Sequence, residues 1–338
     1  MSKYPFLTIA MPVRNEERFI ADTLNQLLNQ DYPADRYEII VADGESSDRT
    51  PEIIEEFSKK NPQVKLMTNP GRLPSSGRNV GFRNGKGDYF LVIDGHCIIP
   101  DNNLFKNVVT LFRKAEVDCL GRPQPFITPD EPSWQRAIAL ARASKLGHSG
   151  DSFIHSQEEG YVSPVSMGCA YSKKVFEKIG YVDEDFDAAE DVEFNYRVEQ
   201  AGFKTFFSPK IAVIYFPREN LKGLWKQLNR YGLGRAKFTF KHPETFNIEI
   251  LLPIVFVLGM VAGPFSWFIH PYLFYAYAVV VLFYLSLVGV FSVRIHTIEP
   301  LSFIGKLFLV FLTIHFGIGV GLLRGFAKEL RKKLSGKK

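Results

Sequence analysis

Three clusters of polar residues hold the side chains with which this sequence could do chemistry. They are Pro12-Val13-Arg14-Asn15-Glu16-Glu17, Asp43-Gly44-Glu45-Ser46-Ser47-Asp48 and Asp94-Gly95-His96. Carboxylate, imidazole and guanidinium groups are the side chains that hold cations, anions and protons. Asn, Asp and Gly are also ordinary turn residues, so each cluster alone is compatible with a plain turn. Each cluster follows a short apolar run, and together they indicate a ligand site.

Strands alternating with amphipathic helices are needed to position these clusters, and the sequence predicts both. The predicted strands are residues 6–11, 37–42, 65–67 and 89–93. The predicted helices are residues 17–29, 50–60 and 75–84. Such alternation is typical of an α/β domain with a largely parallel sheet. Ligands in these sheets bind at the carboxyl ends of the strands, where the three clusters fall.

Several function classes are disfavoured. No G-x-G-x-x-G follows the first predicted strand and no G-x-x-x-x-G-K-[ST] is present, which argues against dinucleotide oxidoreductases and P-loop phosphotransferases. The net charge is only +5, and no basic stripe with interleaved aromatics predicts nucleic-acid binding. Three widely spaced cysteines suit a reducing cytoplasm, and the first residues lack a signal-peptide pattern.

The last third of the chain has a membrane composition. Residues 248–269, 272–293 and 301–323 are each long and apolar enough to span a bilayer, and residues 324–338 form a basic tail. The first stretch is interrupted by Gly259, Gly263 and Pro264, so it is a candidate for a re-entrant segment. A cytoplasmic enzyme domain and a cytoplasmic basic tail on anionic lipid require an even number of crossings. We therefore expect a soluble domain over residues 1–240 followed by membrane helices.

The motifs together resemble glycosyltransferase family 2, with its GT-A fold, a Rossmann-like nucleotide-binding sheet with helices on both faces. The matching pieces are the three polar clusters together with Ser76-Gly77-Arg78-Asn79-Val80-Gly81, Glu190-Asp191 and Gln227-Leu228-Asn229-Arg230-Tyr231. The chain is most similar to the succinoglycan-type exopolysaccharide branch. Marks of that branch are Asp94-Gly95-His96 in place of Asp-x-Asp, Leu146-Gly147-His148-Ser149-Gly150 and Tyr215-Phe216-Pro217-Arg218.

The resemblance implies a nucleotide-sugar site with a divalent cation. Asp94 takes the position of the family's metal carboxylate, and His96 replaces the second carboxylate of the usual pair. Imidazole suits Mn²⁺ better than Mg²⁺, so Mn²⁺ is favoured. The nucleotide-binding residues implied are Pro12, Arg14, Glu16, Asp43, Asp48, Arg78 and Asp94. Uridine diphosphate is the expected carrier, with guanosine diphosphate left open.

The resemblance also assigns the acceptor side. Asp191 is the expected general base and Glu190 positions the acceptor or donor sugar; one base with direct attack implies inversion at the anomeric carbon. Gln227, Arg230 and Tyr231 resemble the Q-x-x-R-W element that contacts diphosphate and acceptor, on a helix expected at the membrane interface over residues 219–238. His148 and His155 are expected in a loop over the site.

The expected activity is transfer of one sugar from a nucleotide donor to a lipid-linked or glycan acceptor at the cytoplasmic face of the plasma membrane. One alternative is transfer directly to polyprenyl phosphate, or to a lipid such as diacylglycerol or ceramide. An alternative of another class is a non-catalytic nucleotide-sugar-binding subunit of a glycan assembly complex. The presence of Asp94, Glu190 and Asp191 argues against that last alternative.

Overall fold

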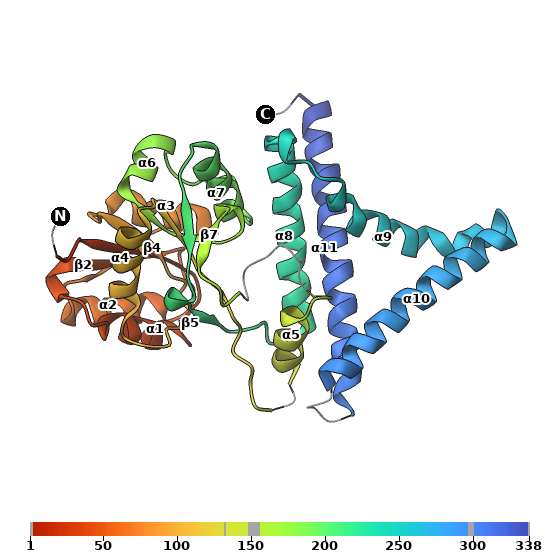
Figure 1. The fold of residues 1–338 in the computed structure, drawn as a ribbon, viewed down its shortest axis with the longest axis horizontal. Coiled ribbons are helices and arrows are strands. Elements are labelled where there is room, and N and C mark those ends of the chain that lie inside the picture. The colour runs from red at the N-terminus through yellow and green to blue at the C-terminus, as the bar shows by residue number, and fades with distance from the viewer. Residues whose placement is uncertain (1–2, 132, 148–155, 297–300, 337–338) are drawn as a thin grey trace. The chain divides into compact units, whose positions relative to one another are not determined.

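A computed structural model describes residues 3–131, 133–147, 156–296 and 301–336. The chain forms two compact units. The first comprises Met1–Phe126 with Ser152–Phe216, and the second comprises Ile127–Asp151 with Pro217–Lys338. The first unit is an α/β domain, and the described part of the second consists of helices (Figure 1).

The first unit is built on a mixed sheet with strand order β3-β2-β1-β4-β8-β6-β9-β7. Its strands are β1 (Leu7–Val13), β2 (Tyr37–Asp43), β3 (Val64–Thr68), β4 (Tyr89–Val92), β6 (Cys119–Gly121), β7 (Gly160–Val162), β8 (Gly168–Ser172) and β9 (Thr205–Phe207). A second, two-stranded antiparallel sheet pairs β5 (Cys97–Ile98) with β10 (Ile214–Tyr215). The four predicted strands are β1 to β4, with ends that differ from the predicted ranges by at most two residues.

The strands β1 to β4 are parallel and nearly continuous in apolar residues, as expected for a sheet covered on both faces. The helices on the two faces are α1 (Ile20–Leu28), α2 (Thr50–Lys60), α3 (Pro74–Asn84), α4 (Leu104–Ala115), α6 (Lys173–Ile179) and α7 (Glu190–Gln200). Ile9 and Met11 face a core completed by α1, α2 and α4. Ala10, between them, faces a core completed by α3, α6 and α7, because side chains alternate along a strand.

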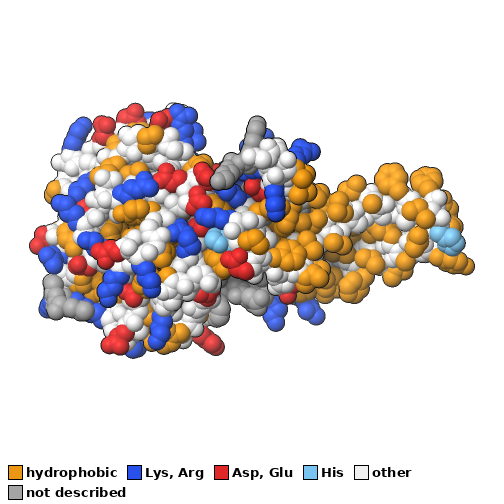
Figure 2. Space-filling model, turned by 90° about the horizontal axis from the view of Figure 1, so that it is seen from above, with side chains coloured by type: hydrophobic (Ala, Val, Ile, Leu, Met, Phe, Trp, Pro, Cys, Tyr) orange, Lys and Arg blue, Asp and Glu red, His pale blue; other side chains and the backbone are white. Residues whose placement is uncertain are grey.

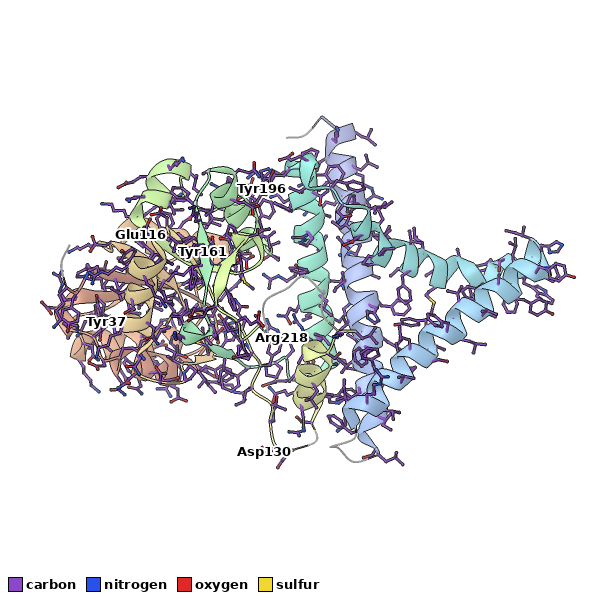
Figure 3. The ribbon with its side chains drawn as sticks, in the orientation of Figure 1. Tyr37, Glu116, Asp130, Tyr161, Tyr196 and Arg218 are labelled. Carbon is purple, nitrogen blue, oxygen red and sulfur yellow. The ribbon has the colours of Figure 1, made fainter. Side chains whose placement is uncertain are left out.

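The far edge of this sheet is tied to the helix layer by an aromatic residue. Tyr161 on β7 packs edge-on against Phe206 of β9 at a centroid separation of 5.3 Å. Its hydroxyl donates to the carbonyl of Ala115 at the end of α4, beside Glu116 in the left-handed conformation (Figure 3). Short 3₁₀ turns at Ala34–Arg36, Pro164–Ser166 and Pro209–Ile211 complete the unit.

The second unit is organised around two long parallel helices. Its helices are α5 (Trp134–Ala143), α8 (Leu221–Lys241), α9 (Leu252–Ala262), α10 (Pro271–His296) and α11 (Phe303–Leu334), with 3₁₀ segments Pro243–Thr245, Ile248–Leu251 and Gly263–Phe268. Gly317, Gly321 and Gly325 on α11 lie against α8 so closely that a Cβ at Gly321 would stand 2.6 Å from the Asn229 carbonyl oxygen. This small-xxx-small spacing allows two helix backbones to approach. The residues expected as a basic tail continue α11 as far as Leu334.

An apolar arm extends within the second unit from α9 through the 3₁₀ segment to α10 (Figure 1). Its side chains are mostly exposed, and orange hydrophobic atoms cover the arm in Figure 2. Three helical stretches are long and apolar enough to cross a membrane, namely Ile248–Phe268, Pro271–Ile295 and Phe303–Leu334. In the first two only 6% and 11% of the most apolar window is buried, against 44% in the third. The arm therefore has the surface of a bilayer-embedded hairpin, whereas α11 is half covered by protein.

Candidate active site

The polar clusters lie side by side because their strands are neighbours. Val13 at the end of β1 pairs with Asp43 at the end of β2, and Ala10 of β1 pairs with Val92 at the end of β4. A Cβ added at Gly95 would stand 3.2 Å from Cγ of Glu16, so the loops after β1 and β4 touch. The expectation that these three strand ends share one edge of the sheet is confirmed.

On the β1–β2 side, the loops are closed by their own hydrogen bonds. Asp43 is buried, and its carboxylate accepts from the amide (3.0 Å) and hydroxyl (2.5 Å) of Ser46. The amide of Asn15, a residue with positive φ, donates to the same hydroxyl at 2.9 Å. Pro12 lies against α3, where a Cβ at Gly77 would stand 2.8 Å from its own, and Arg14 is exposed beside Gly44.

Asp48 is engaged at the start of α2. Its carboxylate accepts from the hydroxyl of Thr50 (2.6 Å), the amide of Thr50 (3.0 Å) and the amide of Glu17 (3.2 Å). Although partial burial acts in the opposite direction, these hydrogen bonds lower the pKa of Asp48. They fix the loop geometry that presents Asp43 and Arg14.

The β4–α7 side holds a cluster of charges. Arg78 on α3 forms an ion pair with Glu190 at 3.2 Å, and both side chains are largely buried, at 16% and 8% exposed. Burial lowers the pKa of Arg78, but the charges of Glu190, Asp191 and Asp94 outweigh this and raise it. Burial raises the pKa of Glu190 to about 7; Arg78 opposes this rise, and the Asp191 and Asp94 charges add to it.

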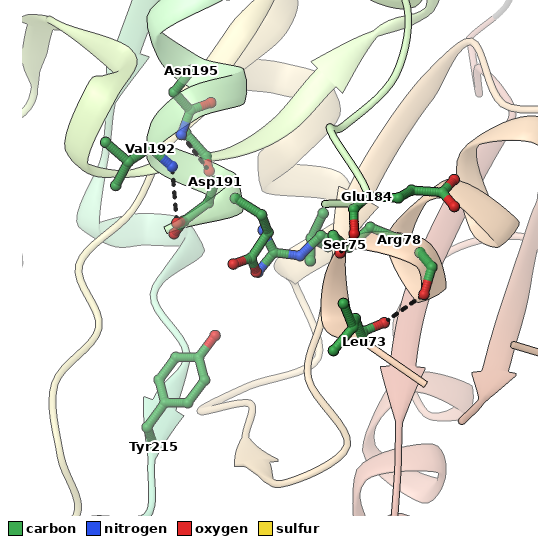
Figure 4. A network of polar contacts seen from close by, with 12 residues as sticks. Leu73, Ser75, Arg78, Glu184, Asp191, Val192, Asn195 and Tyr215 are labelled. Atoms are coloured by element: carbon green, nitrogen blue, oxygen red, sulfur yellow. Dashed lines mark hydrogen bonds and ion pairs between the residues drawn. The ribbon is translucent and has the colours of Figure 1, made fainter. Parts of the chain in front are cut away.

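Asp94 and Asp191 line one cavity together with Arg78 and Tyr215. Asp191 is the second residue of α7, where its carboxylate accepts from the amide of Val192 at 2.9 Å, and the Tyr215 hydroxyl points toward the segment that carries Asp191 (Figure 4). Gly168, Cys169 and Tyr171 of β8 complete the wall between them. The structure thus gathers Asp94, Glu190, Asp191 and Arg78 from three separate segments of the chain.

Asp94 and His96 are the residues that the sequence predicts as cation ligands. Among the residues that the structure describes, none donates a hydrogen bond to the Asp94 carboxylate. Nδ1 of His96 lies 2.8 Å from Oε1 of Glu16, a contact with which carboxylates commonly orient metal-binding imidazoles. No group of three or more His, Cys, Asp or Glu side chains in the described ranges could hold a metal ion. A cation here would therefore take further ligands from the diphosphate, which fits the two-residue donor set.

Arg122 is a cavity residue that the sequence did not indicate. It directly follows the short strand β6, is 1% exposed, and donates through Nη2 to the carbonyl of Val92 at 2.9 Å and the hydroxyl of Tyr215 at 3.2 Å. A lone arginine between Gly121 and Pro123 has no motif around it. The only signal available was its place after a three-residue strand, which the sequence did not predict either.

The predicted acceptor and diphosphate residues belong to the second unit. Gln227, Arg230 and Tyr231 lie on α8, and Arg230 and Tyr231 are exposed rather than packed against α11. Tyr231 lies close enough to Arg142 of α5 for their charges to interact. His148 and His155 lie outside the described residues.

Comparisons with known proteins identify the family. A family model described as glycosyl transferase family 2 matches residues 8–180. A glucuronosyltransferase of Methanococcus voltae that acts on dolichyl N-acetyl-glucosaminyl phosphate is 30% identical over 95% of this chain and 98% of its own length. Succinoglycan biosynthesis protein ExoA of Rhizobium meliloti is 29% identical over 73% of this chain and 74% of its own.

Solved structures give the fold. A mannosyltransferase from Pyrobaculum calidifontis, solved in complex with GDP-mannose and Mn²⁺, superposes with a TM-score of 0.61 at 14% identity, covering 97% of this chain and 89% of its own. The Staphylococcus aureus protein TarS, residues 1–349 in complex with UDP-GlcNAc, superposes with a TM-score of 0.53 at 15% identity, covering 98% and 92%. Both match the GT-A architecture, as the sequence predicted. The chain belongs to glycosyl transferase family 2.

Proposed function

We propose that this protein transfers a single hexosyl residue from a nucleoside diphosphate donor, with uridine as the base, to a lipid-linked or glycan acceptor, with inversion at the anomeric carbon. The observation that carries the proposal is a cavity lined by Asp94, Asp191 and Arg78 at the carboxyl ends of a GT-A sheet, with Glu190 paired to Arg78. The strand ends proposed to bind the nucleotide suit the donor. The carboxylate of Asp191, at the start of α7, suits an attacking hydroxyl.

Asp191 is the proposed general base. Its carboxylate lines the cavity, whereas Glu190 is already paired with Arg78. The acceptor oxygen forms a bond to the anomeric carbon as the bond from that carbon to the diphosphate oxygen breaks. The hydroxyl proton passes to Asp191, and the nucleoside diphosphate leaves with the bonding electrons. Such attack from one face inverts the configuration without a covalent intermediate.

Glu190 and Arg78 are proposed as positioning residues, and Asp94 and His96 as the residues that hold a divalent cation. A bound cation neutralises the diphosphate leaving group as a Lewis acid. An imidazole beside a carboxylate favours Mn²⁺ over Mg²⁺. On the nucleoside side, Asp43 and Arg14 are proposed to contact the base and ribose, with Pro12 and Glu16 shaping the pocket.

Two observations support a lipid-linked acceptor: the apolar helices of the second unit, and the Methanococcus voltae relative. That relative is named for a dolichyl phosphate-linked sugar acceptor, and it matches this chain over nearly its full length. Exposed Arg230 and Tyr231 on α8 offer a cation for phosphate and a ring face for a sugar. A membrane-held enzyme gains effective concentration for an acceptor confined to the same bilayer.

We propose that the α9–α10 hairpin crosses the membrane twice and that α8 and α11 lie at the cytoplasmic interface. α8 carries six lysines and arginines and no acidic residue, and it packs along α11 through Gly317, Gly321 and Gly325. Carrying that many charges through the bilayer core would be costly. Trp267, Tyr272 and Tyr275 are exposed near the turn of the hairpin, where interfacial aromatics are expected. Two crossings keep both ends of the chain in the cytoplasm.

The test is nucleotide release by the purified full chain in detergent. A panel of nucleotide sugars is offered with Mn²⁺, Mg²⁺ or a chelator, with and without a membrane lipid extract. We expect release from one donor that needs a divalent cation, is fastest with Mn²⁺ and increases with lipid. Tight nucleotide binding without release from any donor would instead favour a non-catalytic binding subunit.

A further inference from the structure

Arg122 has hydrogen-bonding capacity that the protein does not use. Its Nη2 is held by the Val92 carbonyl and the Tyr215 hydroxyl, but Nε and Nη1 are buried without a hydrogen-bond partner among the described residues. These two nitrogens carry most of the N–H donors of a guanidinium. Buried donors are nearly always paired in native proteins, so this pair calls for an acceptor from outside the chain.

Arg122 also lacks an ion pair within the described residues. The ionisable groups that affect it most are Tyr215, Cys169 and Cys97. These groups are a phenol and two thiols, not carboxylates. Within the described part of the chain, no carboxylate forms an ion pair with Arg122. A buried cation without an ion-pair partner is costly, and a bound anion would relieve that cost.

Arg78 in the same cavity shows the contrast, because it already has Glu190 at 3.2 Å. Among the described residues, Arg122 is thus the cavity cation that forms no ion pair. The anion could come from the donor's diphosphate or from its sugar, and the sheet order favours the sugar. Across the sheet, β2 and β1, at whose ends the nucleoside is proposed to bind, lie on one side of β4, and Asp94 follows β4 in the chain. On the other side of β4 lie β8 and then β6, and Arg122 follows β6 in the chain. Arg122 is therefore beyond the diphosphate position, in the cavity that holds Asp191.

We propose that Arg122 binds a carboxylate on the transferred sugar, so that the donor is a nucleoside diphosphate hexuronic acid. This inference rests on the proposed function and specifies its donor class. The cavity has a volume of about 30 Å³, which is space for one carboxylate group or roughly two water molecules. Gln124 and Tyr215 line the same cavity and offer further hydrogen bonds to such a group.

The experiment compares matched donors on the purified full chain. Binding of UDP, of UDP-glucuronic and UDP-galacturonic acids, and of the two corresponding UDP-hexoses is measured with Mn²⁺ for the wild type, Arg122→Lys and Arg122→Gln. A charge-assisted buried hydrogen bond predicts that the better uronic acid donor binds about 10- to 100-fold more tightly than its hexose. Arg122→Gln should abolish the difference, Arg122→Lys should keep part of it, and the affinity for UDP should not change.

Two results would overturn the inference alone. The first is a wild type that binds UDP but prefers the hexoses or does not discriminate, a comparison that needs no variant to fold. The second is an Arg122→Gln protein with a wild-type melting temperature whose affinity for UDP falls as much as that for the uronic acid donors, because Arg122 would then hold the diphosphate. Failure of the wild type to bind any of these nucleotides would overturn the proposed function and this inference together.

Discussion

The polar groups at the carboxyl ends of β1 and β2 differ in their hydrogen bonding from those at the ends of β4 and β6. On the β1–β2 side, Asp43 and Asp48 have accepted hydrogen bonds from their own loops. On the β4–β6 side, Asp94 accepts none from the described residues, and Arg122 has two unpartnered buried nitrogens. Polar groups that are hydrogen-bonded within their own loops hold a shape, whereas buried groups without such bonds are available to a ligand. The β1–β2 loops therefore form a preformed frame, and the chemistry is expected in the cavity beyond β4.

The largest effect is expected from Asp191→Asn, which removes the proposed base and keeps the shape of the side chain. Transfer should fall by about 10²- to 10⁴-fold, while UDP binding stays within the error of the wild type. The matched control is Asp187→Asn, an exposed acid in the same segment. Transfer rates and UDP affinity are measured on both variants; full activity of Asp191→Asn would remove Asp191 as the base.

A second prediction concerns Glu190 and the pH dependence of stability. Its pKa of about 7 lies above the ordinary value of 4.5, so the folded protein holds this proton more tightly than the unfolded chain does. Stability from this group is complete below about pH 4.5 and is lost as the pH rises toward 7, by on the order of 3 kcal/mol.

Glu190→Gln should therefore flatten the decline in melting temperature between pH 5 and pH 8. Glu199→Gln, an exposed residue on the same helix, is the control and should leave the decline unchanged. An equally steep decline in Glu190→Gln and the wild type would show that another group titrates.

His96→Ala should raise the Mn²⁺ concentration needed for half-maximal transfer by about 10- to 100-fold and reduce the preference for Mn²⁺ over Mg²⁺. Glu16→Gln, which weakens the contact that orients the His96 ring, should give a smaller shift in the same direction. Metal titrations of nucleotide release measure both. An unchanged Mn²⁺ titration for His96→Ala would leave this histidine a turn residue.

The smallest effect on activity is expected from a substitution on the β1–β2 side. Asp48→Ala removes three hydrogen bonds at the start of α2 and should cost about 1 kcal/mol of stability, as the loss of a helix cap does. If Asp48 only shapes the loop, the KM for the donor stays within about twofold of the wild type. A larger rise in KM without loss of stability would support the direct nucleotide contact that the sequence suggested.

The sequence predicted β1 and β2 because both strands are seven residues long, almost wholly buried and largely apolar; β3 and β4 are shorter but also lie between helical patterns. It did not predict β6, β7 or β9, which are three residues long and too short to show a period. The helix α7 begins at Glu190, after Ala189 adopts a positive φ that no sequence pattern indicates.

The same reason explains which site residues were found. Asp94, Glu190, Asp191 and Arg78 stand in motifs, and their convergence follows from the strand order. The ion pair of Arg78 with Glu190 joins α3 to α7 across more than a hundred residues of sequence, so spacing could not indicate it. Arg122 was found because it is buried and because its Nε and Nη1 have no hydrogen-bond partner among the described residues. A sequence pattern shows neither property.

We propose a direct displacement at the anomeric carbon, assisted by the single base Asp191. The anomeric configuration of the product tests this mechanism. The full chain is incubated with an α-linked UDP-sugar and membrane lipid extract, the glycosylated product is isolated, and its anomeric coupling constants are measured by NMR. A single displacement inverts the α-linked donor, so we expect a β-linked product. An α-linked product would mean retention of configuration and would contradict a single displacement in this cavity.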